Sequence, residues 1–252
     1  MQATTIKGVV LAGGKGTRLG ELTRVTNKHL LPVGNMPMIY HPIKKLVGAG
    51  IHDIMLVSGT EHMGDFTNLL GSGSRLDCEL TYRVQDEAGG IAQALYLAKN
   101  FCKGHSNDVN RGHNCVVLLG DNIFYDKLDA VDVSSVSARL YLKKVEDPGR
   151  YGVAELTGCE DPVVINIIEK PLLPPSDLAV AGLYVFSPTV FEIISKLKPS
   201  HRGELEITDV NNEFIKRGCL RHTFLNGYWT DAGTPESYQL ANRLVTEQPP
   251  LF

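Results

Sequence analysis

The sequence has no long hydrophobic run, no CxxC pair and no excess of one charge. Uncharged apolar runs are short, as at Val116–Leu119, so we expect no membrane-spanning segment. Lys and Arg total 25 against 28 Asp and Glu, which leaves no overall basic surface for nucleic acid. Residues 1–7 carry no basic region followed by an apolar stretch, so no secretory signal is expected. The five cysteines, an odd number, indicate reduced thiols in a cytoplasmic protein.

Several catalytic motifs are also missing. The eight histidines form no HExxH pair, and no GxSxG elbow is present. No cysteine has an evident base nearby in the sequence, which disfavours catalysis through a covalent nucleophile. What the chain has in excess is glycine, at 25 of 252 residues against a usual share of about 7%. Much of this glycine lies in a few loops that follow predicted strands.

The order of predicted elements indicates an α/β fold. Ile6–Ala12 is a β-branched apolar run ended by glycines, which is typical of a buried strand. Up to about residue 119, strands alternate with amphipathic helices. This alternation predicts a Rossmann-like, mostly parallel central sheet flanked by helices. The further strands expected are Ile54–Ser58, Leu80–Val84 and Cys115–Leu119, and the helices are Met38–Gly48, His62–Leu70 and Ile91–Phe101.

After residue 135 the pattern changes to strands with little helix between them, followed by three helices. We expect Ser187 to cap the first of these helices, and Thr208 or Asp209 to cap the second. The whole chain, residues 1–252, is therefore predicted to be one domain with a β-rich insertion at roughly 136–230 and a terminal helix at 235–245. The expected elements are strands Val136–Val145, Gly152–Leu156, Val163–Glu169, Val180–Phe186 and Leu220–Leu225, and helices Pro188–Leu197 and Thr208–Lys216.

A glycine-rich loop, LAGGKGTRL at Leu11–Leu19, directly follows the first predicted strand. Its glycines permit positive φ and close approach of a ligand, and their N–H groups can line an anion-binding concavity. A hydroxyl and a guanidinium follow, and both suit phosphate. The segment therefore predicts a phosphate site rather than a purely structural turn, although Leu19 replaces the third glycine of the dinucleotide fingerprint. The residues concerned are Gly13, Gly14, Gly16, Thr17 and Arg18.

A second glycine site, QDEAGGIAQAL at Gln85–Leu95, ends a predicted strand and opens a helix. Ligands bind at such carboxyl edges of parallel sheets. The Gln85 amide offers one donor and one acceptor, enough to pair with a pyrimidine edge. The Gly90 N–H could bind a base carbonyl. The alternative is a plain helix start that Gln85 caps.

Two aspartates are candidate ligands of a hard cation. Asp121 ends a buried apolar strand in LLGDNIF, and Asp231 lies in GYWTDAGT, 110 residues further on. Mg²⁺ is commonly held by one or two carboxylates together with substrate phosphates. Only the fold can bring the two together, and Asp121 could instead be a turn residue. Trp229, the only tryptophan, either packs in the core or forms the wall of a sugar pocket.

The glycine loop, followed by NKHLLPV at Asn27–Val33, resembles the entry motif of sugar-phosphate nucleotidyltransferases, most of all the bacterial glucose-1-phosphate thymidylyltransferases. The resemblance implies that Leu11 and the glycine loop wrap a nucleoside triphosphate. It also implies that Arg18 and Lys28 grip the departing pyrophosphate, where charge builds as the bond breaks. Gln85 and Gly90 match the positions that bind and recognise thymine in this family. The family more often has Pro-rich residues after the glutamine, so dTTP and UTP both stay open.

The same resemblance assigns the metal and sugar positions. Asp121 and Asp231 match the family's Mg²⁺ ligands. The motifs YGV and EKP match segments whose glycine backbone and glutamate bind sugar hydroxyls and whose lysine binds the sugar phosphate. The segment RGELEITDV at Arg202–Val210 closes the sugar pocket in that family. The implied residues are Lys170 at the phosphate and Asn122, Gly152, Glu169, Val180 and Trp229 at the sugar.

The resemblance thus predicts Mg²⁺-dependent transfer of a nucleotidyl group from dTTP to glucose 1-phosphate. The nucleotide-binding part would span roughly 1–135 and the sugar-binding part roughly 136–230. It implies a homo-oligomer, tetramer or dimer, with no nucleic-acid or membrane partner. Longer members carry an additional C-terminal helical segment at an allosteric site, whereas this sequence stops at Phe252, so we expect weak or absent feedback by the dTDP-sugar. The alternatives are a uridylyl- or cytidylyltransferase, a non-catalytic nucleotide-sugar sensor, and an NAD-dependent oxidoreductase.

Overall fold

The computed structural model describes residues 6–103, 112–128 and 137–252. Contacts divide the chain into two compact units. The parallel-sheet unit comprises Ile6–Ala88, Val116–Val131 and Gly227–Phe252, and the mixed-sheet unit comprises Gly89–Cys115 and Asp132–Asn226 together with Met1–Thr5. Within the described ranges, no helix is both long and apolar enough to cross a membrane. The predicted boundary near residue 135 and the first residue of the predicted strand Val136–Val145 lie outside the described residues.

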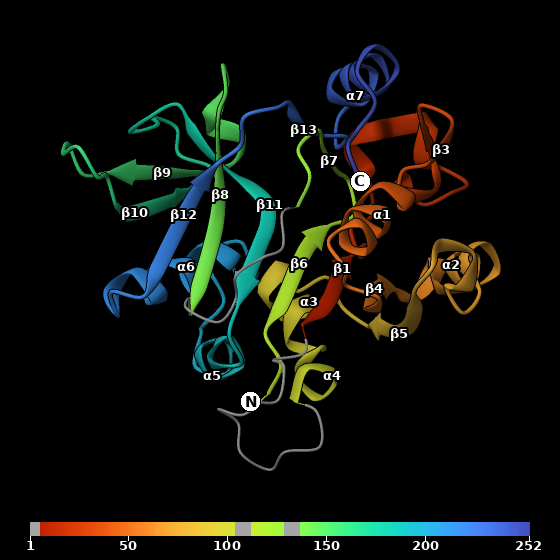
Figure 1. Ribbon diagram of the computed structural model, residues 1–252, viewed down its shortest axis with the longest axis horizontal. Helices are drawn as coiled ribbons and strands as arrows, with labels where there is room; N and C mark the ends of the chain where they lie inside the picture. Colours follow the sequence, from red (N-terminus) through yellow and green to blue (C-terminus); the bar gives the residue numbers. More distant parts are fainter. Residues whose placement is uncertain (1–5, 104–111, 129–136) are drawn as a thin grey trace. The chain divides into compact units, whose positions relative to one another are not determined.

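The parallel-sheet unit contains strands in the order β6, β1, β4 and β5 (Figure 1). Val9 pairs with Met55 in the parallel β1–β4 ladder, and Met55 with Thr81 in the parallel β4–β5 ladder. β1 and β4 are buried on both faces, because these apolar, β-branched runs lie inside a parallel sheet. The predicted mostly parallel sheet is confirmed. The strands are β1 (Lys7–Leu11), β4 (Asp53–Gly59), β5 (Glu79–Gln85) and β6 (Cys115–Leu119).

Two helices of this unit follow strands of the sheet. α1 (Tyr40–Gly48) buries Ile43 and Leu46, and it lies beside β1. α2 (Met63–Leu70) buries Phe66 and Leu70 and contacts β5. Short 3₁₀ turns complete the connections here and in the other unit: η1 (Thr17–Thr23), η2 (Lys28–Leu30), η3 (Thr60–His62), η4 (Ser74–Leu76) and η6 (Pro148–Arg150).

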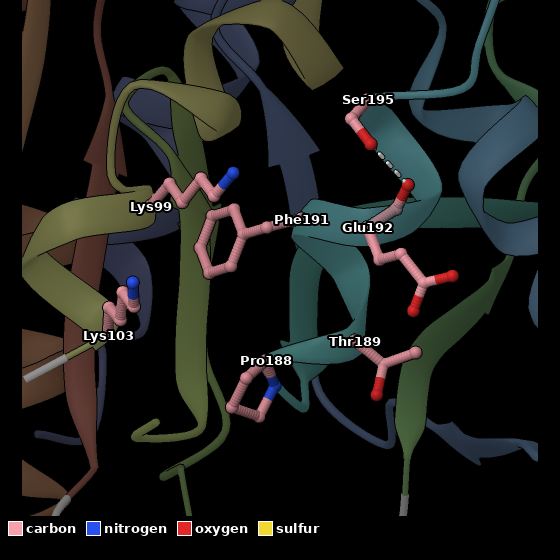
Figure 2. A pocket seen from close by; sticks show the side chains of 7 residues that line it. All are labelled: Lys99, Lys103, Pro188, Thr189, Phe191, Glu192 and Ser195. Atoms are coloured by element: carbon pink, nitrogen blue, oxygen red, sulfur yellow. Dashed lines mark hydrogen bonds between the residues drawn. The ribbon is translucent and has the colours of Figure 1, made fainter. Parts of the chain in front are cut away.

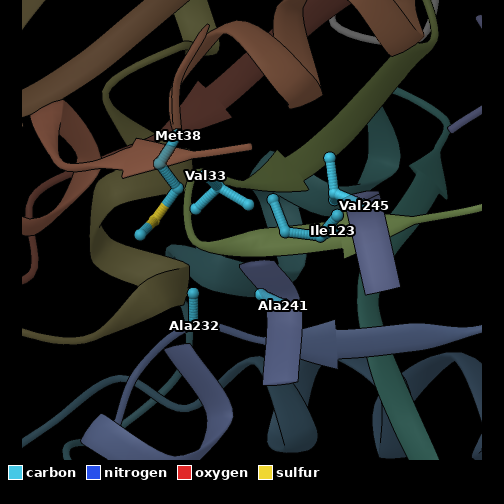
Figure 3. Close-up of a cluster of buried hydrophobic side chains, with 6 residues drawn as sticks. All are labelled: Val33, Met38, Ile123, Ala232, Ala241 and Val245. Carbon is cyan, nitrogen blue, oxygen red and sulfur yellow. The ribbon is translucent and has the colours of Figure 1, made fainter. Parts of the chain in front are cut away.

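Segments far apart in the sequence form two small sheets in the same unit. β7 (Asn122–Phe124) pairs antiparallel with β13 (Trp229–Asp231), and β2 (Pro32–Val33) pairs with β3 (Met36–Pro37). The helix α7 (Pro235–Glu247) begins at a capping box formed by Thr234 and Ser237. Figure 3 shows how these segments share one hydrophobic cluster, made by Val33, Met38, Ile123, Ala232, Ala241 and Val245.

The mixed-sheet unit is rich in strands, as predicted. Antiparallel ladders join β9 to β10, β11 to β9 and β11 to β8, whereas β12 runs parallel to β8. Stacked aromatic rings of Tyr184, Phe186 and Phe214 fill the core beneath this sheet. The strands are β8 (Ala138–Lys144), β9 (Gly152–Leu156), β10 (Val164–Glu169), β11 (Leu178–Phe186) and β12 (Leu220–Phe224).

The helices of this unit correct three expectations. The predicted helix Ile91–Phe101 is two helices, α3 (Ile91–Tyr96) and α4 (Lys99–Lys103), because Leu97 and Ala98 make i→i−3 bonds that tighten the chain. Ser187 does not cap α5 (Thr189–Ile194); its carbonyl accepts from Val190 while its hydroxyl has no partner. Neither Thr208 nor Asp209 caps α6 (Ile207–Lys216), which begins one residue earlier, after Glu206.

Candidate active site

The glycine loop folds over the side chain of Lys28. A Cβ at Gly14 would lie 3.2 Å from Lys28 Cε, and a Cβ at Gly16 would lie 3.0 Å from Lys28 Cβ. Gly16 also has φ +70°, a conformation that favours glycine. Glycine at these positions therefore lets a lysine approach the loop backbone closely. Thr17 and Arg18 follow at the exposed start of η1.

Lys28 and Asp121 form a buried ion pair, although they stand 93 residues apart. Lys28 Nζ donates to Asp121 Oδ2, and the Asn122 amide donates to the other carboxylate oxygen at 2.8 Å. Burial alone would raise the pKa of Asp121, but the Lys28 charge, together with His29 and the hydrogen bonds from Lys28 and Asn122, outweighs burial and holds this pKa well below its usual range. The Asp121 carboxylate is therefore ionised although it is buried.

The β7–β13 pairing brings the second aspartate beside the first. Asp231 pairs in register with Asn122, and the Ala232 N–H donates to the Asp121 carbonyl at 2.8 Å. Both aspartates are buried, with residue exposures of 9% and 8%. A Cβ at Gly233 would lie 2.8 Å from Asp231 Oδ2 and 3.3 Å from Arg18 Nη2. The guanidinium of Arg18 therefore borders the same small space as the Asp231 carboxylate.

These residues fit a magnesium ion. No cluster of three His, Cys, Asp or Glu side chains exists in the described part of the chain, so a complete protein cage for a metal is not formed there. Mg²⁺ does not need one, because it usually binds one or two carboxylates and completes its shell with water and substrate phosphates. Asp121 and Asp231 supply hard oxygen ligands of this kind.

Other candidates of the parallel-sheet unit surround this pair. A Cβ at Gly13 would collide with Gln85 Oε1, so the Gln85 amide lies directly against the glycine loop. Gln85 is buried at the end of β5. The Trp229 indole N–H donates to Asn122 Oδ1 at 2.7 Å, which fixes both side chains beside Asp121. This unit thus holds Leu11, Gly13, Gly14, Gly16, Thr17, Arg18, Lys28, Gln85, Asp121, Asn122, Trp229 and Asp231.

The remaining candidates belong to the mixed-sheet unit: Gly90, Gly152, Glu169, Lys170 and Val180. Glu169 pairs in register with Gly152 across β10 and β9, and Ala179, next to Val180, pairs with Val153. A Cβ at Gly152 would lie 3.5 Å from Glu169 Oε2, so the absence of a side chain leaves that carboxylate accessible.

Lys170 directly follows Glu169 with φ +43°, a strained conformation for a residue other than glycine. Its backbone N–H donates to the Tyr151 carbonyl at 2.9 Å, which holds the strained turn. Its ammonium lies 3.6 Å from Glu169 Oε1, and its side chain is 43% exposed. An exposed cation in a fixed turn is well placed to meet an anionic ligand.

Gly90 adopts φ +99° immediately before α3. The chain on either side of it is tied to Leu205: the Leu205 N–H donates to Gly89 O at 2.8 Å, and the Ala92 N–H donates to Leu205 O at 3.1 Å. A Cβ at Gly90 would lie 2.9 Å from Leu205 N. The second glycine site is thus joined by backbone bonds to the segment Arg202–Val210.

Arg202 and Thr208 contact a group of carboxylates in the mixed-sheet unit. The residue types alone did not predict these contacts. The Arg202 guanidinium lies 3.5, 3.3 and 3.4 Å from carboxylate oxygens of Glu169, Glu204 and Glu206. The Thr208 hydroxyl donates to Glu169 Oε2 at 2.5 Å. Burial raises the pKa of Glu206 despite these partners. The only sequence signal was the RGELEITDV string, because Glu169 is far from Arg202 and Thr208 along the chain.

His29 is a second residue that sequence reasoning did not single out. It is buried next to Lys28, and its Nδ1 lies 2.6 Å from Asn27 Oδ1. Its ring fills the space beside Gly120, where a Cβ would lie 2.8 Å from Cδ2. Burial, together with the Lys28 charge, lowers the pKa of His29 to about 3. The imidazole is therefore neutral next to the ion pair.

This buried histidine predicts a pH dependence of stability. The unfolded chain binds a proton at His29 near pH 6.5, whereas the folded chain does so only near pH 3, so the free energy of unfolding falls as pH drops below 6.5. Between pH 6.5 and 5 the loss is about 2 kcal/mol. Urea unfolding at pH 7 and 5 measures it, and His29→Gln should flatten the dependence. An equally steep dependence in that variant would contradict the assignment.

A glycine loop lies over a lysine–aspartate pair, beside a second aspartate, and these residue types fit a phosphate group and a hard cation. A family model described as nucleotidyl transferase matches residues 7–248. The chain therefore belongs to the nucleotidyl transferase family.

The chain is also similar to individual members of this family and to solved structures. A glucose-1-phosphate thymidylyltransferase of Neisseria meningitidis serogroup A is 40% identical over 247 residues, covering 95% of this chain and 82% of the relative. A crystal structure from Bacillus anthracis, assigned as a glucose-1-phosphate thymidylyltransferase in complex with sucrose, superposes with a TM-score of 0.85 at 50% identity, covering 95% and 94%. A UDP-glucose pyrophosphorylase complexed with UDP-glucose superposes with a TM-score of 0.78 at 25% identity, covering 96% and 98%.

Proposed function

We propose that the protein transfers the nucleotidyl group of dTTP to glucose 1-phosphate, giving dTDP-glucose and pyrophosphate. The observation that carries the proposal is the buried Lys28–Asp121 pair beneath the glycine loop, with Asp231 held beside it by the β7–β13 ladder. The names of the Neisseria and Bacillus relatives support the same substrates.

The reaction is an in-line displacement at phosphorus. An oxygen of the sugar phosphate attacks the α-phosphorus of dTTP, and the bond from that phosphorus to the bridging oxygen of the β-phosphate breaks. The electron pair leaves with pyrophosphate. Because the sugar phosphate is already ionised, no strong general base is required, and no group of the protein becomes covalently modified.

The parallel-sheet unit would bind the nucleotide. N–H groups of the glycine loop would bind the triphosphate, and Arg18 and Lys28 would stabilise the charge that develops on pyrophosphate. Arg18 suits this role because it is exposed and makes no ion pair with any residue in the described ranges. Asp121 and Asp231 would hold Mg²⁺, which, when bound, neutralises phosphate charge.

The mixed-sheet unit would bind the sugar phosphate. Carboxylates accept hydrogen bonds from hydroxyl groups, and Glu169 is held for this purpose by Thr208 and Arg202. The Lys170 ammonium would pair with the phosphate and orient its attacking oxygen. We further propose that residues 1–252 work as one catalytic domain and that the protein forms homo-oligomers.

Uridylyl transfer is the second candidate, and two observations favour it. The Gln85 amide can pair equally with thymine and uracil, because the two bases differ only by a methyl group away from the paired edge. The UDP-glucose pyrophosphorylase structure also superposes over 96% of the chain. The nucleotide specificity therefore has to be measured.

The test is pyrophosphate release with Mg²⁺, glucose 1-phosphate and each of dTTP, UTP, CTP, GTP and ATP in turn. We expect the fastest release with dTTP and none when either the sugar phosphate or Mg²⁺ is omitted. A preference for UTP would support the proposed nucleotidyl transfer but would replace thymine by uracil as the preferred base. No release with any nucleotide, while nucleotide binding persists, would favour a non-catalytic sensor.

A further inference from the structure

A small pocket of about 130 Å³ lies between α4 and α5 in the mixed-sheet unit, and none of the candidate active-site residues lines it. Figure 2 shows the Phe191 ring in the middle of the view as part of the pocket lining, with Lys99 and Lys103 of α4 on one side and Glu192 of α5 on the other. Pro188 closes the lower end in this view. The pocket thus combines an apolar ring surface with cations on a single side.

The two lysines are unusual for their position. Lysine side chains are mostly exposed, yet Lys99 and Lys103 are both only partly exposed. Lys99 Nζ donates to the Tyr96 hydroxyl at 3.2 Å and lies 5.2 Å from the centre of that ring, which holds the ammonium in place. Among the described residues, no carboxylate lies within ion-pair distance of either lysine. Two neighbouring positive charges therefore have no counter-ion in this part of the structure.

Glu192 and Ser195, on the opposite side of the pocket, already have hydrogen-bond partners. Glu192 Oε1 accepts from Lys196 Nζ at 2.6 Å, and this hydrogen bond lowers the pKa of Glu192. The Ser195 hydroxyl donates to the Glu192 carbonyl at 2.7 Å (Figure 2). A negatively charged group in the pocket would therefore be attracted to its α4 side, where the ammonium groups of Lys99 and Lys103 lie.

The volume of the pocket indicates the size of the ligand that it could bind. A cavity of roughly 150 Å³ binds benzene, so a pocket of about 130 Å³ is close to the size of a single ring. Aromatic rings favour offset or edge-to-face contact with one another, and Phe191 offers such a surface.

We propose that the pocket binds a small monocyclic aromatic anion, with its ring against Phe191 and its carboxylate or phosphate group paired with Lys99 and Lys103. This inference does not depend on the proposed function, because none of the candidate substrate residues takes part. It defines an accessory ligand site on α4 and α5.

The test is calorimetric titration of the full chain with benzoate, with phenyl phosphate and with uncharged benzyl alcohol. We expect saturable binding of at least one anion and weaker binding of the alcohol; the better anion identifies the charged group. The double variant Lys99→Gln/Lys103→Gln should weaken binding about tenfold. The control Lys198→Gln/Lys216→Gln, which removes two exposed charges of the same unit outside the pocket, should leave the affinity unchanged.

Three results would overturn the proposal. The first is no saturable binding of either anion, and the second is equal affinity in the pocket variant and the control variant. The third is displacement of the anion by dTTP, which would place it in the nucleotide site. Equal thermal unfolding midpoints for both double variants would show that any difference in binding comes from the pocket rather than from misfolding.

Discussion

Replacing Asp121 by asparagine is expected to lower kcat by about a thousandfold. Asparagine keeps the shape of the side chain and can still accept from Lys28, but it removes the charge that would hold Mg²⁺ beside Asp231. Because Lys28 loses its charged partner, the free energy of unfolding should also fall, by about 2 kcal/mol. Steady-state kinetics and urea unfolding on the same preparation separate these two effects.

The matched control is Asp77→Asn. Asp77 is exposed and has φ +57°, a left-handed conformation that asparagine tolerates well. This variant removes the same charge far from the ion pair and should keep full activity. If Asp121→Asn retained activity within about tenfold of the unmodified protein, the assignment of Asp121 as a metal ligand would be wrong.

Replacing Lys28 by glutamine should affect stability and activity together. The Asp121 carboxylate would stay buried without its cation, and breaking a buried pair in this way costs about 3 kcal/mol. The pKa of Asp121 should rise, because burial would no longer be outweighed by the Lys28 charge. The loss of a cation at pyrophosphate should lower kcat by about a hundredfold.

A double-mutant cycle separates the two roles of Lys28. The variant Lys28→Gln/Asp121→Asn contains no unpaired buried charge, so it should regain most of the lost stability while staying inactive. Lys15→Gln, an exposed lysine of the same loop, serves as the control and should leave stability unchanged. Additive stability losses in the double variant would mean that the two side chains do not interact as the structure indicates.

Local features of the fold could be predicted because they depend on neighbouring residues. The buried runs of β1, β4 and β6 are continuous and apolar, and the structure confirms each as a strand within a residue or so. The break between α3 and α4 could not be predicted, because no proline or glycine marks it. Helix caps were misjudged where a polar side chain found a distant partner, as Thr208 did in Glu169.

The candidate site was only partly visible in the sequence. The glycine loop is a continuous string, so its residues could be named without a structure. The pairing of Lys28 with Asp121 and of Asp231 with Asn122 depends on strands that meet only in the folded chain. The contact of Arg202 with Glu169 and the neutral state of His29 arise only in the folded chain, where distant segments meet and the imidazole is buried.

The most direct test of the account follows the α-phosphate of the nucleotide. The protein is incubated with Mg²⁺, glucose 1-phosphate and dTTP labelled with ³²P at the α-position, and the products are separated. The account predicts that the label appears in dTDP-glucose and that unlabelled pyrophosphate forms in equal amount. Label in free dTMP or dTDP, with no sugar nucleotide formed, would contradict transfer to the sugar phosphate.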